Sequence, residues 1–305
     1  MAKPSILSAL RSGRILVADG AWGTALYARG LAKGECPELW CLTHPEEVRI
    51  VAADYLAAGA ELVGTNSFGA NRFRLEGYGL ADRVAELNET AARLSRMTVG
   101  DAASVLGSMG PSGLRWGEAS PEDLAGAFAL QARSLAAGGV DALCVETIMD
   151  AREAAIAVHA AKAATGLEAI CSYSFALGSD GIARTIAGQS MQEAAAVALD
   201  AGADILGANC GRGFDEMLFV LHQLIIAARE VESGAPIMVS PNVGVPAAVG
   251  AYPDTPSAME AFARAAIAEG AAIVGGCCGT TAEHVRAIRR AVDDAIDRGA
   301  AEALL

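Results

Sequence analysis

The sequence contains no long apolar run, no cluster of basic residues and few aromatic residues. No stretch of about 18 uncharged apolar residues occurs, and a membrane-spanning helix would require one. Charges at Lys3, Arg11 and Arg14 interrupt the start of the chain, where a secretion signal would have a continuous apolar run. These absences predict a cytoplasmic protein with no membrane partner.

Positive charge and paired cysteines are also scarce. The net charge is −13, and no group of lysine and arginine residues offsets it locally. A field of this sign repels phosphate backbones, so no nucleic-acid partner is expected. The chain has seven cysteines, an odd number, and disulfides are not expected in a reducing compartment. The adjacent thiols of Cys277 and Cys278 therefore suggest metal binding or catalysis.

Turn residues divide the chain into eight short apolar runs that alternate with alanine-rich stretches of helical pattern. The runs are apolar almost throughout, as in parallel strands that are covered on both faces. Eight such units predict a single (β/α)8 TIM barrel over residues 1–305, because no Pro-, Ser- or Gly-rich linker divides the chain. An open, doubly wound sheet is the alternative. The expected strands are 15–20, 61–68, 103–110, 142–148, 169–175, 205–210, 236–242 and 273–278, and the expected helices are 46–58, 82–97, 121–137, 150–164, 190–201, 214–231, 256–269 and 281–298.

Similar junctions precede the second, fourth, sixth and eighth expected strands. They read LAAGAELVGTN, LAAGGVDALCVET, LDAGADILGANC and IAEGAAIVGGCC. In each, a glycine follows a helix end and can adopt the left-handed conformation of that position. A junction that recurs at every second strand indicates a closed array built from double units.

Two expected helix starts carry capping patterns. Ser120 precedes Pro121, which is typical of a serine N-cap followed by proline at the first helical position. Thr280 and Glu283 have the spacing of a capping box. Both patterns support the helices expected at 121–137 and 281–298.

Polar residues gather where the expected strands end, which is where the active sites of TIM barrels lie. Any one of them could be a helix cap or a turn residue. Unpaired polar groups are costly inside a barrel, so the whole set indicates a functional site. The set comprises Asp19, Thr65-Asn66-Ser67, Glu146-Thr147, Asn209-Cys210, Asn242 and Cys277-Cys278.

Three of these residues, Cys210, Cys277 and Cys278, offer the thiolate ligands that zinc prefers. A structural zinc site normally has four protein ligands, whereas a catalytic site keeps one position open. Successive strand residues point to opposite sides, so the adjacent pair needs a turn to converge. The glycines around the pair would allow that turn.

The remaining cysteines have simpler interpretations. Cys144 and Cys171 lie inside apolar strands, where a thiol usually serves as inert packing. Cys36 and Cys41 have CxxxxC spacing in the first loop, but a second zinc site there would lack further ligands.

A set of motifs occurs along the chain in the order DGAWGT (19–24), TNSFGAN (65–71), ET (146–147), GANC (207–210), SPNVG (240–244) and GGCCGT (275–280). In this order they resemble the homocysteine S-methyltransferase family. That family includes betaine–homocysteine methyltransferase and the homocysteine-binding module of cobalamin-dependent methionine synthase. The resemblance covers a core of about residues 12–295, and GANC followed by GGCCGT is its most specific part.

The resemblance implies a TIM barrel with a zinc ion, Zn2+, held by Cys210, Cys277 and Cys278. The sulfur of L-homocysteine is then a further ligand, and its ionised form attacks an electrophilic methyl group to give methionine. Three thiolate ligands leave the site with a charge of about −1, and this surplus keeps the bound sulfur nucleophilic.

The resemblance also implies contacts to the amino-acid part of the substrate. Asp19 and Glu146 would hold its ammonium group. Backbone amides of the turn from Ala21 through Trp22 to Thr24 would take its carboxylate. Trp22 departs from the pattern, since methionine synthases commonly carry Met there, and this change alters packing beside the substrate.

Supporting roles follow from the same resemblance. Thr65 and Ser67 would assist in holding the amino-acid part of the substrate. Asn209 and Asn242 would orient the metal ligands and the loops around them.

The methyl donor has two interpretations. The PELW segment (37–40) and TNSFGANRFRLEGYGL resemble the methionine-synthase branch, which favours a methyl-corrinoid carrier as donor. The sequence ends soon after the expected barrel, so a corrinoid or folate module would belong to a separate protein. Direct use of betaine, S-methylmethionine or another onium donor is the alternative. Aromatic residues, which bind such cations, make up only 5% of the chain, although Trp22, Trp40, Phe68 and Trp116 could gather at the barrel mouth.

A non-enzymatic alternative is a zinc-binding or redox-switch barrel in which Cys277 and Cys278 form a vicinal disulfide. This alternative accounts for the paired cysteines. It does not account for Asp19, Glu146 or the glycine-rich first loop.

Overall fold

The computed structural model describes residues 4–231, 233–245 and 252–302. Its main sheet has eight parallel strands in the order β1-β10-β9-β8-β5-β4-β3-β2 within the described residues. A parallel bridge between Ala18 and Leu62 joins the two ends of this order and closes the sheet. The predicted TIM barrel is confirmed, and the closure excludes the open, doubly wound alternative. The strands are β1 (Leu16–Val17), β2 (Leu62–Gly64), β3 (Ser104–Met109), β4 (Ala142–Ile148), β5 (Glu168–Tyr173), β8 (Ile205–Cys210), β9 (Ile237–Pro241) and β10 (Ile273–Val274).

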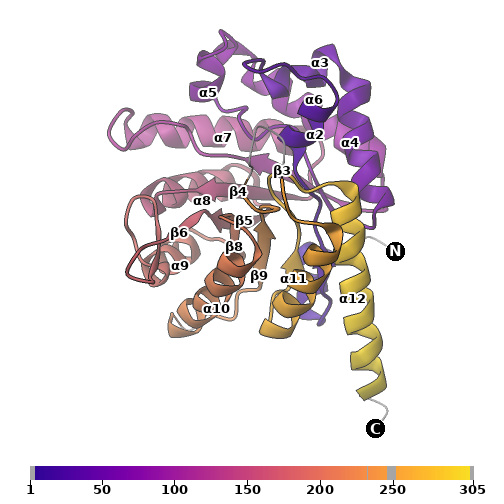
Figure 1. Cartoon of the computed structure of the whole chain (residues 1–305). Helices are drawn as coiled ribbons and strands as arrows, with labels where there is room; N and C mark the ends of the chain where they lie inside the picture. The colour runs from indigo at the N-terminus through magenta and orange to yellow at the C-terminus, as the bar shows by residue number, and fades with distance from the viewer. Residues whose placement is uncertain (1–3, 232, 246–251, 303–305) are drawn as a thin grey trace.

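Long helices surround the strands, as Figure 1 shows. One follows each barrel strand in the described part of the chain, in agreement with the alternation read from the sequence. They are α4 (Pro45–Ala57), α6 (Val84–Val99), α7 (Pro121–Ala137), α8 (Ala151–Thr165), α9 (Met191–Asp200), α10 (Phe214–Glu230), α11 (Pro256–Glu269) and α12 (Ala282–Glu302).

The structure also contains short helices and a hairpin that the sequence analysis did not predict. Most lie in the loops that follow strands, where tertiary contacts rather than a long periodic pattern stabilise them. They are α1 (Ile6–Arg11), α2 (Trp22–Ala28), α3 (Trp40–Thr43), α5 (Arg72–Glu76), the 3-10 turns η1 (Pro37–Leu39) and η2 (Ala81–Arg83), and the hairpin of β6 (Phe175–Leu177) and β7 (Ala183–Thr185). No helix among the described residues is long and apolar enough to cross a membrane.

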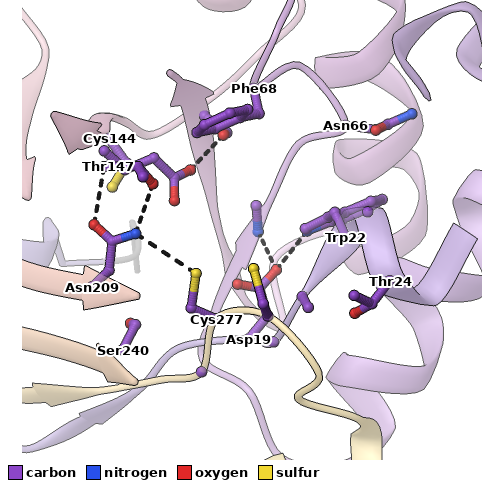
Figure 2. A pocket seen from close by; sticks show the side chains of 18 of the residues that line it. Asp19, Trp22, Thr24, Asn66, Phe68, Cys144, Thr147, Asn209, Ser240 and Cys277 are labelled. Atoms are coloured by element: carbon purple, nitrogen blue, oxygen red, sulfur yellow. Dashed lines mark hydrogen bonds between the residues drawn. The ribbon is translucent and has the colours of Figure 1, made fainter. Parts of the chain in front are cut away.

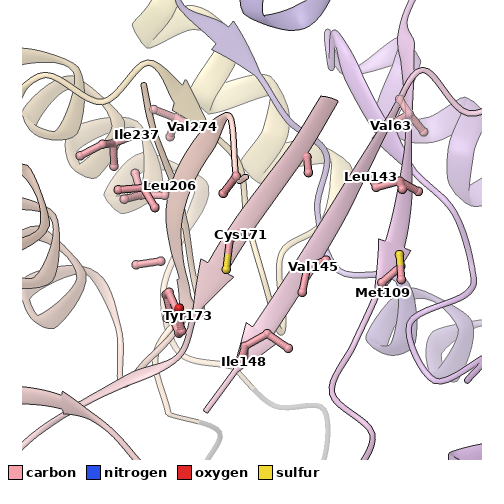
Figure 3. Packing of buried hydrophobic residues seen from close by; sticks show 14 of the residues in the cluster. Val63, Met109, Leu143, Val145, Ile148, Cys171, Tyr173, Leu206, Ile237 and Val274 are labelled. Carbon is pink, nitrogen blue, oxygen red and sulfur yellow. The ribbon is translucent and has the colours of Figure 1, made fainter. Parts of the chain in front are cut away.

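Two separate apolar layers account for the uninterrupted apolar strands. Alternate residues of each strand point to opposite faces. One set packs between the strands and the outer helices, as Val145, Cys171 and Tyr173 do in Figure 3. The other set fills the barrel interior, where Ile170 and Ile205 lie. Helix α1 joins this inner layer with its apolar residues and so packs against the barrel interior.

The repeated helix-to-strand junctions depend on glycine in the predicted way. The backbone angle φ is +99° at Gly59, +95° at Gly139, +99° at Gly202 and +120° at Gly270. Side chains with a Cβ rarely adopt such angles. The left-handed turns are confirmed at all four junctions.

The two capping predictions have different outcomes. The Ser120 side chain accepts a hydrogen bond from the backbone N–H of Asp123, so this N-cap is confirmed. The capping box of Thr280 is wrong, because α12 begins at Ala282 and Thr281 precedes it. The backbone N–H of Thr281 donates to Nδ1 of His284 at 3.2 Å, so an imidazole takes the place of the expected carboxylate.

Helix α7 offers a test of the packing around the barrel. A Cβ added to Gly138, at its end, would lie 2.5 Å from both Cβ of Ala92 and the carbonyl oxygen of Glu89 on α6. We expect Gly138→Ala to lower the free energy of unfolding by about 1–3 kcal/mol, because α6 and α7 must separate. Gly126 of the same helix has open space around it. Gly126→Ala should therefore raise the free energy of unfolding by about 0.5–1 kcal/mol. Urea unfolding measures both, and equal effects would contradict the assigned helix contact.

Candidate active site

A cavity of about 480 Å³ lies at the carboxyl ends of the barrel strands. Asn242 is not among the residues that line it, whereas the other residues predicted for the site are. Those lining residues are Asp19, Ala21, Trp22, Thr24, Thr65, Ser67, Glu146, Asn209, Cys210, Cys277 and Cys278.

The thiols of Cys210, Cys277 and Cys278 form one group in this cavity, called the three-cysteine cluster below. Their sulfur atoms all lie within 4.8 Å of one another, and Sγ of Cys210 is 3.1 Å from Sγ of Cys277. A tetrahedral zinc ion with Zn–S bonds near 2.3 Å separates its sulfurs by roughly 3.8 Å. The cluster could hold such an ion with small side-chain adjustments. Among the described residues, no fourth side chain joins this group.

The adjacent cysteines converge because they lie in a turn rather than in a strand. Strand β10 ends at Val274, and Gly279 has a φ of +82°. A Cβ on Gly279 would also lie 2.3 Å from the ring of Tyr252. A Cβ on Gly276 would lie 2.3 Å from Oγ1 of Thr280. The glycines next to the pair are therefore required for the close approach of the surrounding chain.

The third thiol depends on an unusual backbone. Cys210 ends β8 with a φ of +67°, a conformation that residues with a Cβ rarely adopt. Its carbonyl oxygen accepts a hydrogen bond from the N–H of Asn242 at 3.0 Å. The Asn242 side chain donates to the carbonyl of Gly211 at 2.8 Å and accepts from the N–H of Cys278 at 2.9 Å. Asn242 thus ties the segments of Cys210 and Cys278 together.

Charge in the three-cysteine cluster is shared among its members. Hydrogen bonds from Cys210 and Cys277 lower the pKa of Cys278 to about 3. The pKa of Cys277 is raised, because it donates to Cys210 and Cys278 and is buried. One thiolate is therefore stabilised by the protons of its neighbours, and a bound dication would allow all three thiols to ionise. This donor set fits zinc.

Two carboxyl groups, Asp19 and Glu146, lie in the same cavity. Oδ2 of Asp19 accepts hydrogen bonds from the N–H of Gly64 at 2.7 Å and from Nε1 of Trp22 at 2.9 Å, as Figure 2 shows. Glu146 accepts a hydrogen bond from the hydroxyl of Ser108. Burial raises the pKa of Asp19 to about 6 and that of Glu146 to about 7.

No lysine or arginine is among the described residues that line this cavity. Two partly buried acids without a basic partner are costly to ionise, so they favour a cationic ligand group. The arrangement can therefore bind a molecule with a positive charge at one end and a group that ligates a metal at the other.

The hydroxyls of Thr65 and Ser67 have partners within the protein. Their oxygens are 2.6 Å apart, and Oγ of Ser67 donates to the carbonyl of Ser108 at 2.7 Å. The N–H of Ser108 donates to Oγ1 of Thr65 at 3.0 Å. These bonds connect the end of β2 to β3, so both hydroxyl protons are used inside the protein.

The first loop is held by contacts that sequence motifs do not reveal. The carbonyl of Ala21 accepts a hydrogen bond from the hydroxyl of Tyr55 at 2.7 Å, and Oγ1 of Thr24 accepts one from the N–H of Gly279 at 3.4 Å. Trp22 begins α2 and directs its indole N–H at Asp19.

Sequence reasoning missed several residues of the cavity wall. Ser108 donates a hydrogen bond to Glu146, and its signal was a polar residue near the end of a mostly apolar strand. Tyr252 has no local signal, because only the folded chain places it beside Gly279. Cys144 lines the cavity, but burial raises the pKa of its thiol well above the ordinary range, in keeping with inert packing.

A closed barrel with three thiols and two partly buried acids at its mouth defines a TIM-barrel enzyme with a candidate metal centre. The chain belongs to the homocysteine S-methyltransferase family, whose model matches residues 16–292. The predicted family and the prediction of a methyltransferase are confirmed.

Individual relatives agree with this assignment. The chain is 33% identical over 300 residues to the methionine synthase of Mycobacterium tuberculosis (strain ATCC 25618 / H37Rv), covering 92% of this chain and 25% of the relative. It is 32% identical over 311 residues to the methionine synthase of Mycobacterium leprae (strain TN), covering 94% of this chain and 25% of the relative. The chain thus spans about a quarter of the length of these relatives.

A solved structure shares the fold. The metallated form of the homocysteine methyltransferase MmuM from Escherichia coli superimposes with a TM-score of 0.76 at 25% identity, covering 93% of this chain and 99% of that chain.

The partly buried carboxyl group of Glu146 leads to a prediction about how stability depends on pH in the chain without metal or substrate. Its pKa is raised from 4.5 to about 7, so the unfolded state ionises first as the pH rises. Stability is therefore lost as the pH rises from 4.5 to about 7, by about 3.5 kcal/mol at about 1.4 kcal/mol per pKa unit. Glu146→Gln should escape this loss. Urea unfolding at pH 5 and pH 8 measures it, and the exposed Glu76→Gln should behave like the unmodified chain. An equal pH dependence in all three proteins would contradict the buried acid.

Proposed function

We propose that the chain binds one zinc ion through Cys210, Cys277 and Cys278 and transfers a methyl group to the thiol of L-homocysteine, which gives methionine. The observation that carries this proposal is the presence of the three-cysteine cluster and two partly buried carboxyl groups in one cavity. Family membership supports it. Free thiols in this number suit a reducing compartment such as the cytoplasm.

The amino-acid end of the substrate lies between Asp19 and Glu146 in this proposal. Both acids are partly buried without a basic partner in the described cavity wall, so the substrate ammonium stabilises their ionised forms. Residues Ala21 to Thr24 line the same cavity, and their backbone amides hold the carboxylate in this proposal. Trp22 fixes one oxygen of Asp19 and leaves the other for the ligand.

The thiol end of the substrate lies at the three-cysteine cluster. A free thiol has a pKa near 8.5, so little thiolate exists at neutral pH. A zinc ion in the cluster would supply the positive charge that favours the ionised substrate sulfur. Asn209 and Asn242 orient the cysteines, and the enclosed cavity limits water around the reacting atoms. The substrate sulfur then attacks the methyl carbon in line with the departing donor.

The preferred methyl donor is a methyl-corrinoid on a separate carrier protein. The support is the similarity to methionine synthases, of which this chain spans about a quarter. An onium donor such as betaine or S-methylmethionine is the second candidate, because Trp22 and Phe68 line the cavity. Trp40 and Trp116 do not join them: Trp40 stacks on His44, and Trp116 lies against Arg152. Methionine formation should require the methylcobalamin carrier, and turnover with an onium donor alone would reverse this preference.

A purely zinc-storing or redox-switch barrel is a weaker proposal. It leaves the paired burial of Asp19 and Glu146 without a role, and the family consists of methyltransferases. The site chemistry is better explained by a reaction on an amino-acid thiol.

Zinc content tests the proposed ligands. We expect about one zinc ion per chain, and Cys210→Ala, Cys277→Ala or Cys278→Ala should each remove tight binding, because three thiolates are the minimum set here. Cys171→Ala is the control, since this thiol packs between strands and helices away from the cluster. Metal analysis after dialysis measures the content. Full zinc in the three cluster variants would overturn the ligand assignment.

Substrate binding tests the link between thiol and metal. L-homocysteine should bind to the zinc-loaded chain with release of about one proton near neutral pH, because the thiol must ionise. Methionine should bind more weakly and release none. Asp19→Asn should weaken homocysteine binding by about 1–3 kcal/mol while zinc is retained. Calorimetry in buffers of different ionisation enthalpy counts the proton, and zinc-independent binding of homocysteine would refute the mechanism.

A further inference from the structure

Strand β4 contains an irregularity beside the candidate substrate site. The register of β4 against β5 shifts between Val145 and Ile148. Within this stretch Thr147 has a φ of +58°. A β-branched residue in the left-handed region is a genuine outlier, and such outliers persist only where neighbouring contacts hold them. Glu146 directly precedes it, so the backbone at Thr147 influences where the Glu146 carboxyl lies.

One side chain, Asn209, holds this backbone. Oδ1 of Asn209 accepts a hydrogen bond from the N–H of Thr147 at 2.9 Å, and its Nδ2 donates to Oγ1 of Thr147 at 2.7 Å. Oδ1 also accepts from the hydroxyl of Ser172 at 2.8 Å. Figure 2 shows Asn209 facing Thr147 on one side and Cys277 on the other. A backbone N–H can only donate, so the orientation of the carboxamide is determined by Thr147.

The same carboxamide reaches the three-cysteine cluster. Its Nδ2 lies 3.6 Å from Sγ of Cys210 and 3.7 Å from Sγ of Cys277. Asn209 is buried at 3% exposure, so each of its polar atoms needs a partner within the protein. Thr147 occupies one N–H and one lone pair of the carboxamide, which leaves the second N–H directed at the sulfurs.

We infer that Thr147 is a positioning residue that acts through Asn209. It holds the Glu146 carboxyl group and the sulfurs of Cys210 and Cys277 in fixed positions relative to one another. The inference rests on the proposed function, because these groups are the two ends of the homocysteine site. Loss of the Thr147 hydroxyl removes one of the two hydrogen bonds by which Thr147 holds the carboxamide of Asn209. Oδ1 keeps its bonds to the N–H of Thr147 and to Ser172, so the carboxamide is not reversed, but its Nδ2 can tilt away from the sulfurs. The metal end and the amino-acid end of the site then lose their alignment together.

Substitutions at Thr147 separate the hydroxyl from shape and backbone conformation. Thr147→Val keeps the branched shape and removes the acceptor. Thr147→Gly adopts the left-handed backbone without strain and also removes the acceptor, so it covers the case in which the valine variant does not fold. Thr147→Ser keeps the hydroxyl and is the matched control.

The experiment uses the full chain and two probes, zinc alone and L-homocysteine with the zinc-loaded protein. Competition with a chelator gives zinc affinity, calorimetry gives homocysteine affinity, and thermal melting checks the fold. We expect the valine and glycine variants to lose about tenfold or more in both affinities, in the range for groups that orient metal ligands. The serine variant should remain within about threefold of the unmodified chain.

Each outcome of this experiment has one meaning. Folded valine and glycine variants with both affinities within about threefold of the unmodified chain would overturn the positioning role, even if their melting temperatures fall. A loss of the same size in the serine variant would also overturn it, since the hydroxyl would then be irrelevant. An unmodified chain that binds neither zinc nor homocysteine would instead overturn the proposed function.

Discussion

The convergence of three sulfur atoms at the barrel mouth is the constraint on which the local structure depends. Cys210 lies at the end of β8 and Cys277 and Cys278 follow β10, so the thiols come from strands separated by β9. The backbone of Cys210 adopts a left-handed conformation, and Cys277 and Cys278 lie in a turn flanked by glycines. The Asn242 side chain connects the two segments, because it donates a hydrogen bond to the carbonyl of Gly211 and accepts one from the N–H of Cys278. The unfavourable backbone conformation at these positions persists because contacts within the closed barrel hold the surrounding chain in place.

A second constraint is the burial of two acids. Asp19 and Glu146 lie in a cavity whose described wall offers no basic side chain, and burial raises the pKa of both. An ionised carboxyl pair in such surroundings needs a cation, and a cluster of thiolates needs a metal cation to neutralise it. An amino acid that carries a thiol offers an ammonium group to the carboxyl pair and a ligand to a metal held by the thiolates. One ligand of this kind therefore accounts for both the acids at one end of the cavity and the cysteines at the other.

Much of the fold could be predicted from local pattern. The eight apolar runs became the eight barrel strands because parallel strands covered on both faces must be apolar throughout. The short helices were missed, since α1 and α2 are too brief for a periodic signal and are stabilised by contacts with the barrel. Thr280 was misassigned for a similar reason: the spacing to Glu283 fits a capping box, but His284 makes the contact in the folded chain.

The sequence by itself determined which residues could take part in chemistry, since the cysteines, the acids and the flanking glycines stand at strand ends in a recognisable order. Only the tertiary structure decided how they are connected. Thr65 and Ser67 turned out to join two strands, whereas Ser108 holds Glu146 and Thr147 pairs with Asn209. These partners are distant along the chain. Ser108 and Glu146 are 38 residues apart, and Thr147 and Asn209 are 62 residues apart. No local pattern encodes such pairs, because they exist only once barrel closure sets the strand ends side by side.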